Sequence, residues 1–351
     1  MKKFSKEFID PEYYRKNPRN PDFNNILSVL ENKRPSRPTL FEFFMNDKLT
    51  EDVVAPGETD AITRNILTFK NCGYDYVTAR VSEFDFPTGN DTHQAQTRSL
   101  NDAAISDRQG FDNYPWKEVE NCDFSALDEY ERLMPEGMKL MISGPNGVLE
   151  NVIRVTGYDN LCYMLIDDPE LCRAVFDGVG SRMVKYYEKC VPHPSVGVVM
   201  CNDDWGFNTQ TMISPQHMRE YLFPWHKKIA DVARKNGKPI VLHSCGKLSA
   251  VMDDIIDDIG FNGKHSYEDN ILPVEEAYDQ YGDRIAILGG IDLNFLCQST
   301  PEQVYERAAA MLARTAEKGG YGLGSGNSIP EYVPLPNYYA LIAAANFNNW
   351  E

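Results

Sequence analysis

The stretch KPIVLHSCGKL, residues 238–248, joins a short apolar run to two potential metal ligands. Residues 239–242 are apolar, and a run of this length is typical of a strand buried on both faces. The run ends in His243, and Cys245 and Gly246 follow it. In parallel-sheet proteins, functional side chains gather where the strands end. The stretch therefore predicts a parallel sheet with a site at its carboxyl edge.

Similar runs recur along the chain, at residues 39–45, 74–80, 138–143, 196–201, 239–243, 260–265, 284–290 and 319–325. The segments between them have helical patterns. Residues 300–319 begin with Thr300 as N-cap and Pro301 at the first helical position, and Gly319 ends them. Another helix, within residues 214–237, is expected to kink at Pro224. Strands that alternate with helices imply a parallel sheet, so eight such units predict an α/β fold, a (β/α)8 TIM barrel.

We expect two regions in the chain. Residues 1–36 form a mostly helical N-terminal extension that ends in the breaker sequence KRPSRP, and residues 37–351 form the barrel. The connections 81–137 and 144–195 are longer than one crossover helix needs. The first is rich in polar and aromatic residues, and we predict that residues 82–116 cover the barrel mouth and set the choice of substrate.

The charge and the cysteines narrow the class of protein. The net charge of the 351 residues is −17, which argues against nucleic acid or an anionic membrane as a partner. A run of about 18 apolar residues, as a membrane span needs, does not occur, and the N-terminal stretch lacks the apolar core of a secretory signal. The eight cysteines are scattered without a CxxC pair, which is typical of free thiols. We therefore expect a cytoplasmic protein.

The His-x-Cys pair at a strand end has two interpretations. Imidazole nitrogen and thiolate sulfur are both preferred zinc ligands, and side chains two residues apart on an extended chain point to the same side. A catalytic zinc needs a third ligand, so the pair taken alone favours a hydrogen-bonded histidine of the core over a zinc site. Gly246 allows the backbone to turn away after the pair.

Polar side chains follow every apolar run from the second onward. They are Arg80, Glu83, Ser143, Asp203, Asp204, His243, Cys245, His265, Glu268, Asp292, Ser325 and Asn327. The adjacent carboxylates in CNDDWG, residues 201–206, cannot both point into one site from an extended chain. We expect Asp204 to face the barrel mouth while Asp203 caps a helix or pairs elsewhere; a simple loop turn is the alternative.

Four separated motifs are shared with a known family. They are NDDWGFNTQTMISPQHMREYLFPWHKKI, GKPIVLHSCGKL, YGDRIAILGGIDL and GGYGLGSGNSIPEYVPLPNY, and they cover most of residues 195–340. With these motifs the chain resembles the uroporphyrinogen decarboxylase superfamily, and more closely its cobalamin-linked methyltransferase branch. The N-terminal half is similar through RPSRPTLFEFFM and MKLMISGPNGVLE. The resemblance implies a (β/α)8 barrel, in agreement with the pattern of runs.

The resemblance to the methyltransferase branch also implies zinc, held by the His-x-Cys pair and by a cysteine in the loop after the eighth strand. His243 and Cys245 match the first two positions, but the third falls on Asn327, and asparagine is a poor zinc ligand. We expect an acidic residue or Cys201 to complete the site. The available donors are Cys201, Asp204, Glu268 and Asp292. Cobalamin would be carried by a separate corrinoid protein.

The predicted function is therefore transfer of a methyl group between a small molecule, such as a methoxy or methylthio compound or a thiol, and the cobalt of a corrinoid partner. The expected roles are catalysis for Asp204, His243 and Glu268, substrate binding for Arg80, Glu83, Trp205 and Asn327, and metal binding for His243 and Cys245.

Two alternatives stay open. One is a metal-free lyase of the same superfamily, in which His243 and Asp204 exchange protons and Arg80 anchors a carboxylate. The other is a non-catalytic relative that binds a ligand or a corrinoid protein. Residues 44–53, FMNDKLTEDV, stand where the true decarboxylases have an arginine-rich RQAGR segment. This acidic segment disfavours a porphyrinogen with its many carboxylates.

Overall fold

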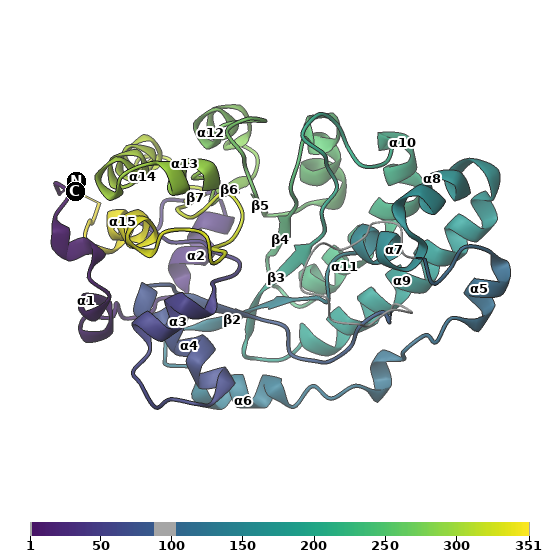
Figure 1. Ribbon diagram of the computed structural model, residues 1–351, viewed down its shortest axis with the longest axis horizontal. Coiled ribbons are helices and arrows are strands. Elements are labelled where there is room, and N and C mark those ends of the chain that lie inside the picture. The colour runs from purple at the N-terminus through teal and green to yellow at the C-terminus, as the bar shows by residue number, and fades with distance from the viewer. Residues whose placement is uncertain (1, 88–102, 351) are drawn as a thin grey trace.

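Parallel strands form the centre of the molecule, and helices surround them (Figure 1). The computed structural model describes residues 2–87 and 103–350. Across these ranges the strands are β1 (Tyr76–Ala79), β2 (Lys139–Ser143), β3 (Val196–Asn202), β4 (Ile240–His243), β5 (Gly263–His265), β6 (Ala286–Leu288) and β7 (Tyr321–Gly322). They pair in chain order, each parallel to the next. The fold is TIM-barrel-like, as the alternation of strands and helices predicts.

The helices precede the first strand, connect successive strands and follow the last one. The α-helices are α1 (Pro11–Lys16), α2 (Asn24–Leu30), α3 (Asp47–Val53), α4 (Ala61–Cys72), α5 (Arg108–Asn113), α6 (Ala126–Leu133), α7 (Val148–Thr156), α8 (Tyr158–Asp167), α9 (Pro169–Cys190), α10 (Pro215–His217), α11 (Phe223–Lys235), α12 (Val274–Tyr281), α13 (Leu293–Gln298), α14 (Pro301–Thr315) and α15 (Leu335–Asn346). Short 3₁₀ or π segments are η1 (Lys6–Ile9), η2 (Val119–Asn121), η3 (Met218–Leu222), η4 (Ser249–Val251) and η5 (Asp254–Ile259). No helix within the described ranges is long and apolar enough to cross a bilayer.

Two predicted helices have the expected ends. Thr300 caps α14 in a capping box with Gln303, and Pro301 is its first residue. The helical stretch before β4 changes from π to α hydrogen bonding next to Pro224, and the kink expected there stays a prediction. There the N–H of Phe223 bonds to the carbonyl of Met218, five residues back, so a π turn precedes the proline.

The first apolar run, residues 39–45, differs from the prediction of a full strand. Within the described residues it forms isolated bridges, Leu40 to Leu323 and Met45 to Ile329, and so lies beside β7. On the other side, the hydroxyl of Tyr76 in β1 accepts from the N–H of Glu42 and donates to its carbonyl, both at 2.7 Å. Because a side chain occupies these backbone groups, they are not available for a ladder with β1.

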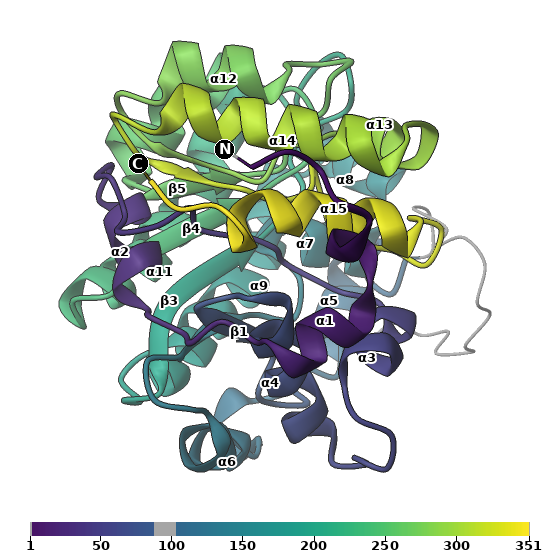
Figure 2. The ribbon, with the colours of Figure 1, turned by 90° about the vertical axis from the view of Figure 1, so that its left-hand side faces the viewer.

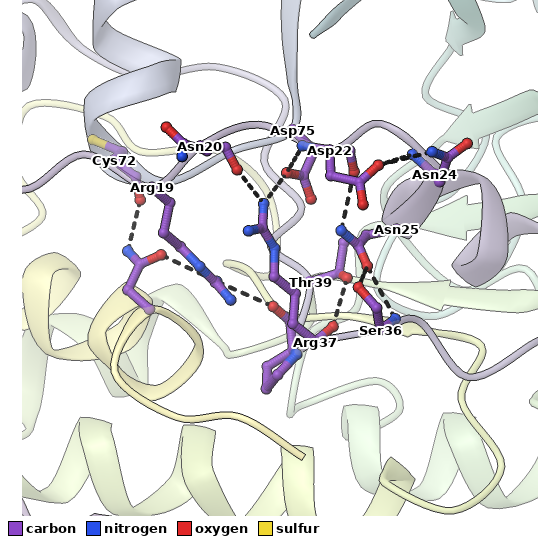
Figure 3. Close-up of polar contacts among 12 residues, drawn as sticks. Arg19, Asn20, Asp22, Asn24, Asn25, Ser36, Arg37, Thr39, Cys72 and Asp75 are labelled. Atoms are coloured by element: carbon purple, nitrogen blue, oxygen red, sulfur yellow. Dashed lines mark hydrogen bonds and ion pairs between the residues drawn. The ribbon is translucent and has the colours of Figure 1, made fainter. Parts of the chain in front are cut away.

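Residues 19–39 cover the N-terminal end of the strands. Helix α2 contacts β7, and the N–H of Phe23 bonds to the carbonyl of Gly137 just before β2. Arg37 lies at the centre of this region, where its guanidinium donates to the Asn20 carbonyl at 2.8 Å and to Asp75 at 2.5 Å (Figure 3). The boundary of the extension at residue 36 stays a prediction.

The two ends of the chain meet on one side of the barrel (Figure 2). Near the N-terminus, Tyr14 of α1 donates to the carbonyl of Tyr339 in α15, and the rings of Phe8 and Phe347 stack. The N–H of Lys2 donates to the side chain of Asn348 at 2.6 Å. The first residues are thereby fastened to the last helix of the fold.

Loss of the Arg37–Asp75 pair is expected to destabilise the fold strongly. The Asp75 side chain is 3% exposed, and burial raises its pKa although Arg37 opposes that shift. Arg37→Met strands a buried carboxyl, which costs about 3–5 kcal/mol of unfolding free energy, measured by urea denaturation. Arg132→Met is the control because its pair with Glu129 is exposed, and about 1 kcal/mol or less is expected there. Equal losses of unfolding free energy in Arg37→Met and Arg132→Met would contradict a strong stabilising role for the buried Arg37–Asp75 pair.

Candidate functional site

The register of the sheet places two histidines side by side at its carboxyl edge. His243 ends β4 and pairs with Asn202 of β3 on one side and with His265 of β5 on the other. Both rings are buried, and their Nδ1 atoms lie 2.7 Å apart. The ring of Phe43 lies against His243, and the ring of Phe41 lies against His265. This second histidine is among the polar side chains that follow the apolar runs, but the sequence pattern gives His265 no role in the site.

Cys245 lies beside His243, as predicted, with its sulfur 3.9 Å from Nε2 of the ring. Its backbone N–H donates to Oδ1 of Asp204 at 2.8 Å. Its sulfur accepts from Nδ2 of Asn327 at 3.1 Å and from the hydroxyl of Ser266 at 3.5 Å. One ligand atom each of Asp204, His243 and Cys245 lies within 4.8 Å of the other two.

This donor set fits a zinc ion. Bond lengths of ~2.0–2.3 Å place two ligands of one tetrahedral zinc roughly 3.3–3.8 Å apart. The 3.9 Å between the Cys245 sulfur and Nε2 of His243 is close to that value, and a carboxylate oxygen of Asp204 lies within 4.8 Å of both. Nitrogen, sulfur and carboxylate oxygen are all zinc ligands, whereas calcium and magnesium prefer oxygen alone.

The other donors considered from the sequence lie elsewhere or have other partners. Cys201 is buried beside Tyr187 of α9. Asp292 caps α13 through the N–H of Phe295 and also accepts from the N–H of Asp269. Glu268 accepts a long bond, 3.4 Å, from the N–H of Gly246. Asp204 is therefore the acidic residue that the structure brings to the pair.

The two adjacent aspartates divide their tasks, as expected. Asp203 is fully buried and accepts from the backbone N–H groups of Leu149 and Glu150 at the start of α7, and from Nε2 of His226 at 2.8 Å. A carboxylate at a helix N-terminus is favoured by the free N–H groups and by the helix dipole. Asp204, the next residue, points to Cys245.

Burial decides the protonation of the cluster. It lowers the pKa of His243 to about 4, although Asp204 opposes the shift. Burial and the neighbouring His243 lower the pKa of His265 well below its usual value. Burial raises the pKa of the Cys245 thiol to about 12, and Asp204 acts in the same direction. Both rings are therefore neutral at pH 7, the state in which imidazole binds metals.

An open hollow of about 950 Å³ adjoins the cluster, and Cys245, Glu268 and Asn327 line it. It gives small molecules access to the sulfur side of the cluster. Sites of this size accommodate ligands of small-molecule dimensions.

Three residues expected to bind substrate lie apart from the cluster. Arg80 and Glu83 line a separate hollow of about 1160 Å³, and the guanidinium of Arg80 donates to the carbonyl of Ser82. Trp205 is fully buried against Phe223 and His226. Their roles stay predictions.

The segment predicted to cover the mouth is described in part, because residues 88–102 lie outside the described ranges. On its far flank, the N–H groups of Ala104 and Ile105 bond to the carbonyl of Val155 in α7. On its near flank, Asp85 pairs with Arg154 of the same helix at 2.7 Å. Both flanks thus lie along α7, and the covering role stays a prediction.

Sequence comparison matches this chain to one protein family and to individual relatives. The model of a family described as uroporphyrinogen decarboxylase (URO-D) matches residues 141–347. The methylcobamide:CoM methyltransferase MtaA of Methanosarcina barkeri is 31% identical over 134 residues, which are 38% of this chain and 37% of that protein. The uroporphyrinogen decarboxylase of Psychromonas ingrahamii is 23% identical over 190 residues, 52% of this chain and 50% of that protein. The chain thus matches half or less of the length of these relatives.

Among solved structures, a methyltransferase from Methanosarcina mazei superposes with a TM-score of 0.70. The superposition covers 93% of this chain and 99% of that chain at 17% sequence identity. At this identity the likeness concerns the fold, and it extends over nearly the whole of both chains.

Gly246, directly after the cluster, is expected to be essential for the turn that presents Cys245. Its φ is +83°, and a Cβ there would overlap the backbone carbonyl of Gly206. Gly246→Ala is therefore expected to lower the unfolding free energy by about 3 kcal/mol or more in urea denaturation. Gly237→Ala is the matched control, because φ is +64° with nothing within 4 Å, and a loss of ~1 kcal/mol is expected. A loss no larger at Gly246 than at Gly237 would refute the packing argument.

Proposed function

Because this chain belongs to the uroporphyrinogen decarboxylase (URO-D) family, we propose that it is a methyltransferase acting between a small molecule and the cobalt of a corrinoid partner protein. The observation that carries the proposal is the cluster of Asp204, His243 and Cys245 at the strand ends beside an open hollow. The similarity to a methylcobamide:CoM methyltransferase, 31% identical over 134 residues, supports the choice of reaction within the family.

His243, Cys245 and Asp204 would hold a zinc ion. One thiolate and one carboxylate carry two negative charges, which balance the charge of Zn²⁺. When bound, zinc would lower the pKa of a substrate thiol well below about 8.5 and so supply the nucleophile that accepts a methyl group. Asn327 stands where the resemblance places a third ligand, but here its amide donates to the sulfur of Cys245.

The remaining side chains of the cluster have supporting tasks in this proposal. Asn327 and Ser266 donate to the Cys245 sulfur and so stabilise its anionic form. Glu268 lines the hollow beside Cys245 and is placed to take up the proton that a thiol releases. The substrate enters through the hollow, and the partner protein presents its cobalt there.

Metal content and methyl transfer test the proposal together. The wild-type chain is expected to retain about one zinc per chain, as read by elemental analysis. It should also transfer the methyl group of methylcobalamin to a small thiol, giving a thioether, cob(I)alamin and a proton, followed by absorbance. Removing a residue that contacts a metal ligand without binding the metal typically costs roughly 10–100-fold in metal affinity. Cys245→Ser and Asp204→Asn change a proposed ligand itself, so each is expected to weaken zinc binding by more than that.

Cys162→Ser is the matched control, because this cysteine lies on α8, half-buried and outside the cluster. It is expected to keep both the zinc and the activity. A wild-type protein that transfers methyl groups at full rate after exhaustive chelation, with no metal retained, would refute the zinc site. Activity on a carboxylated substrate without metal would favour the lyase instead.

A further inference from the structure

We infer that His265 is a positioning residue that fixes the tautomer of His243, so that the Nε2 atom of His243 is free of hydrogen and faces the metal-binding side chains. That Nε2 of His243 binds a metal rests on the proposed function, whereas the tautomer itself follows from the geometry of the hydrogen bonds.

The ring nitrogen of His265 that does not contact His243 determines the tautomer of His265. Its Nε2 atom lies 3.2 Å from the carbonyl oxygen of Ser325. A carbonyl oxygen can only accept a hydrogen bond, so Nε2 of His265 must carry the proton. A neutral imidazole has one N–H, and Nδ1 of His265 is therefore an acceptor.

The next contact transfers this assignment to the metal ligand. The Nδ1 atoms of His265 and His243 are 2.7 Å apart, a separation that requires one proton between them. Since Nδ1 of His265 is bare, the proton belongs to Nδ1 of His243. The single N–H of His243 is thereby used, and its Nε2, which faces the sulfur of Cys245, presents a lone pair.

The Ser325 carbonyl that starts this chain is itself held in place. The backbone N–H and the hydroxyl of Ser325 both donate to the carboxyl group of Glu42, at 3.2 and 2.9 Å. A Cβ on Gly289 would lie 2.7 Å from Nε2 of His265 and would overlap the Ser325 carbonyl. Glycine at this position leaves room for the contact between the histidine and the carbonyl.

The consequence for metal binding is direct. With the opposite tautomer, an N–H group would point at the place where the ion must bind, and the ring would have to exchange its proton first. Residues that fix the tautomer and ring orientation of a metal ligand typically contribute about 10–100-fold to metal affinity.

Nitrogen NMR of the metal-free protein tests the tautomer without reference to any metal. The chain has six histidines, so labelling histidine alone with ¹⁵N gives few signals, which His243→Gln and His265→Gln assign. The expected spectrum shows a protonated Nδ1 and a bare Nε2 for His243, and the reverse for His265. A protonated Nε2 on His243 would overturn the inference.

Two variants of similar size then separate the acceptor from the packing. His265→Asn keeps an oxygen that can accept from Nδ1–H of His243, whereas His265→Leu removes the acceptor. Zinc affinity is measured by competition with a chromophoric chelator. The leucine variant is expected to bind zinc ~10–100-fold more weakly than the wild type, and the asparagine variant to recover most of the loss. Equal affinity of the leucine variant and the wild type would count against a positioning role.

The outcomes distinguish this inference from the proposed function. If the wild type binds no zinc, the proposed metal site is refuted, and the NMR spectrum still decides the tautomer. If the leucine variant does not fold, as shown by circular dichroism, the spectrum of the wild type again decides. If the wild type binds zinc with the opposite tautomer, the positioning role is wrong while the metal site stands.

Discussion

The parallel register of β3, β4 and β5 is the constraint on which the cluster depends. Hydrogen bonding aligns Asn202, His243 and His265 at one level, so the residues that follow each strand emerge at the same edge. A shift of β4 by one residue would turn His243 towards the helices and move Cys245 with it. The ladder of the sheet, rather than the loops, therefore determines which side chains meet.

A second level of order comes from Asp203. Its carboxylate joins the end of β3 to the first turn of α7 and to His226 of α11, all within the buried interior. Because successive residues of an extended chain point to opposite sides, fixing Asp203 towards the helices fixes Asp204 towards the strand ends. Trp205 follows Asp203 to the helical side, which explains its burial away from the cluster. One buried carboxylate thus orients three consecutive side chains.

The features that local chemistry determines were predictable from the sequence. The apolar runs predict where the strands lie, and Thr300 and Pro301 predict where α14 begins. Because Asp203 and Asp204 are adjacent, their side chains were expected to point to opposite sides and to have different partners, which is what the structure shows. The role of His265 was not predictable, because GFNGKH is a weak strand pattern and the partner His243 is 22 residues away. The bond from Asn327 to Cys245 spans 82 residues and depends on the closure of the barrel. For residues 39–45, a tyrosine hydroxyl from β1 replaces the expected ladder, and no pattern within the run itself indicates that.

The position of Glu42 has a consequence for the order in which the site is completed during synthesis. Its backbone is held by Tyr76 and its carboxyl group by Ser325, so this residue joins an early segment of the chain to a late one. Asp204, His243 and Cys245 leave the ribosome well before Ser325 and Asn327 do. The nascent chain therefore carries Asp204, His243 and Cys245 while the groups that contact His265 and the Cys245 sulfur are still missing. The full set of contacts around the cluster therefore requires the segment that follows β7 to lie against residues 39–45.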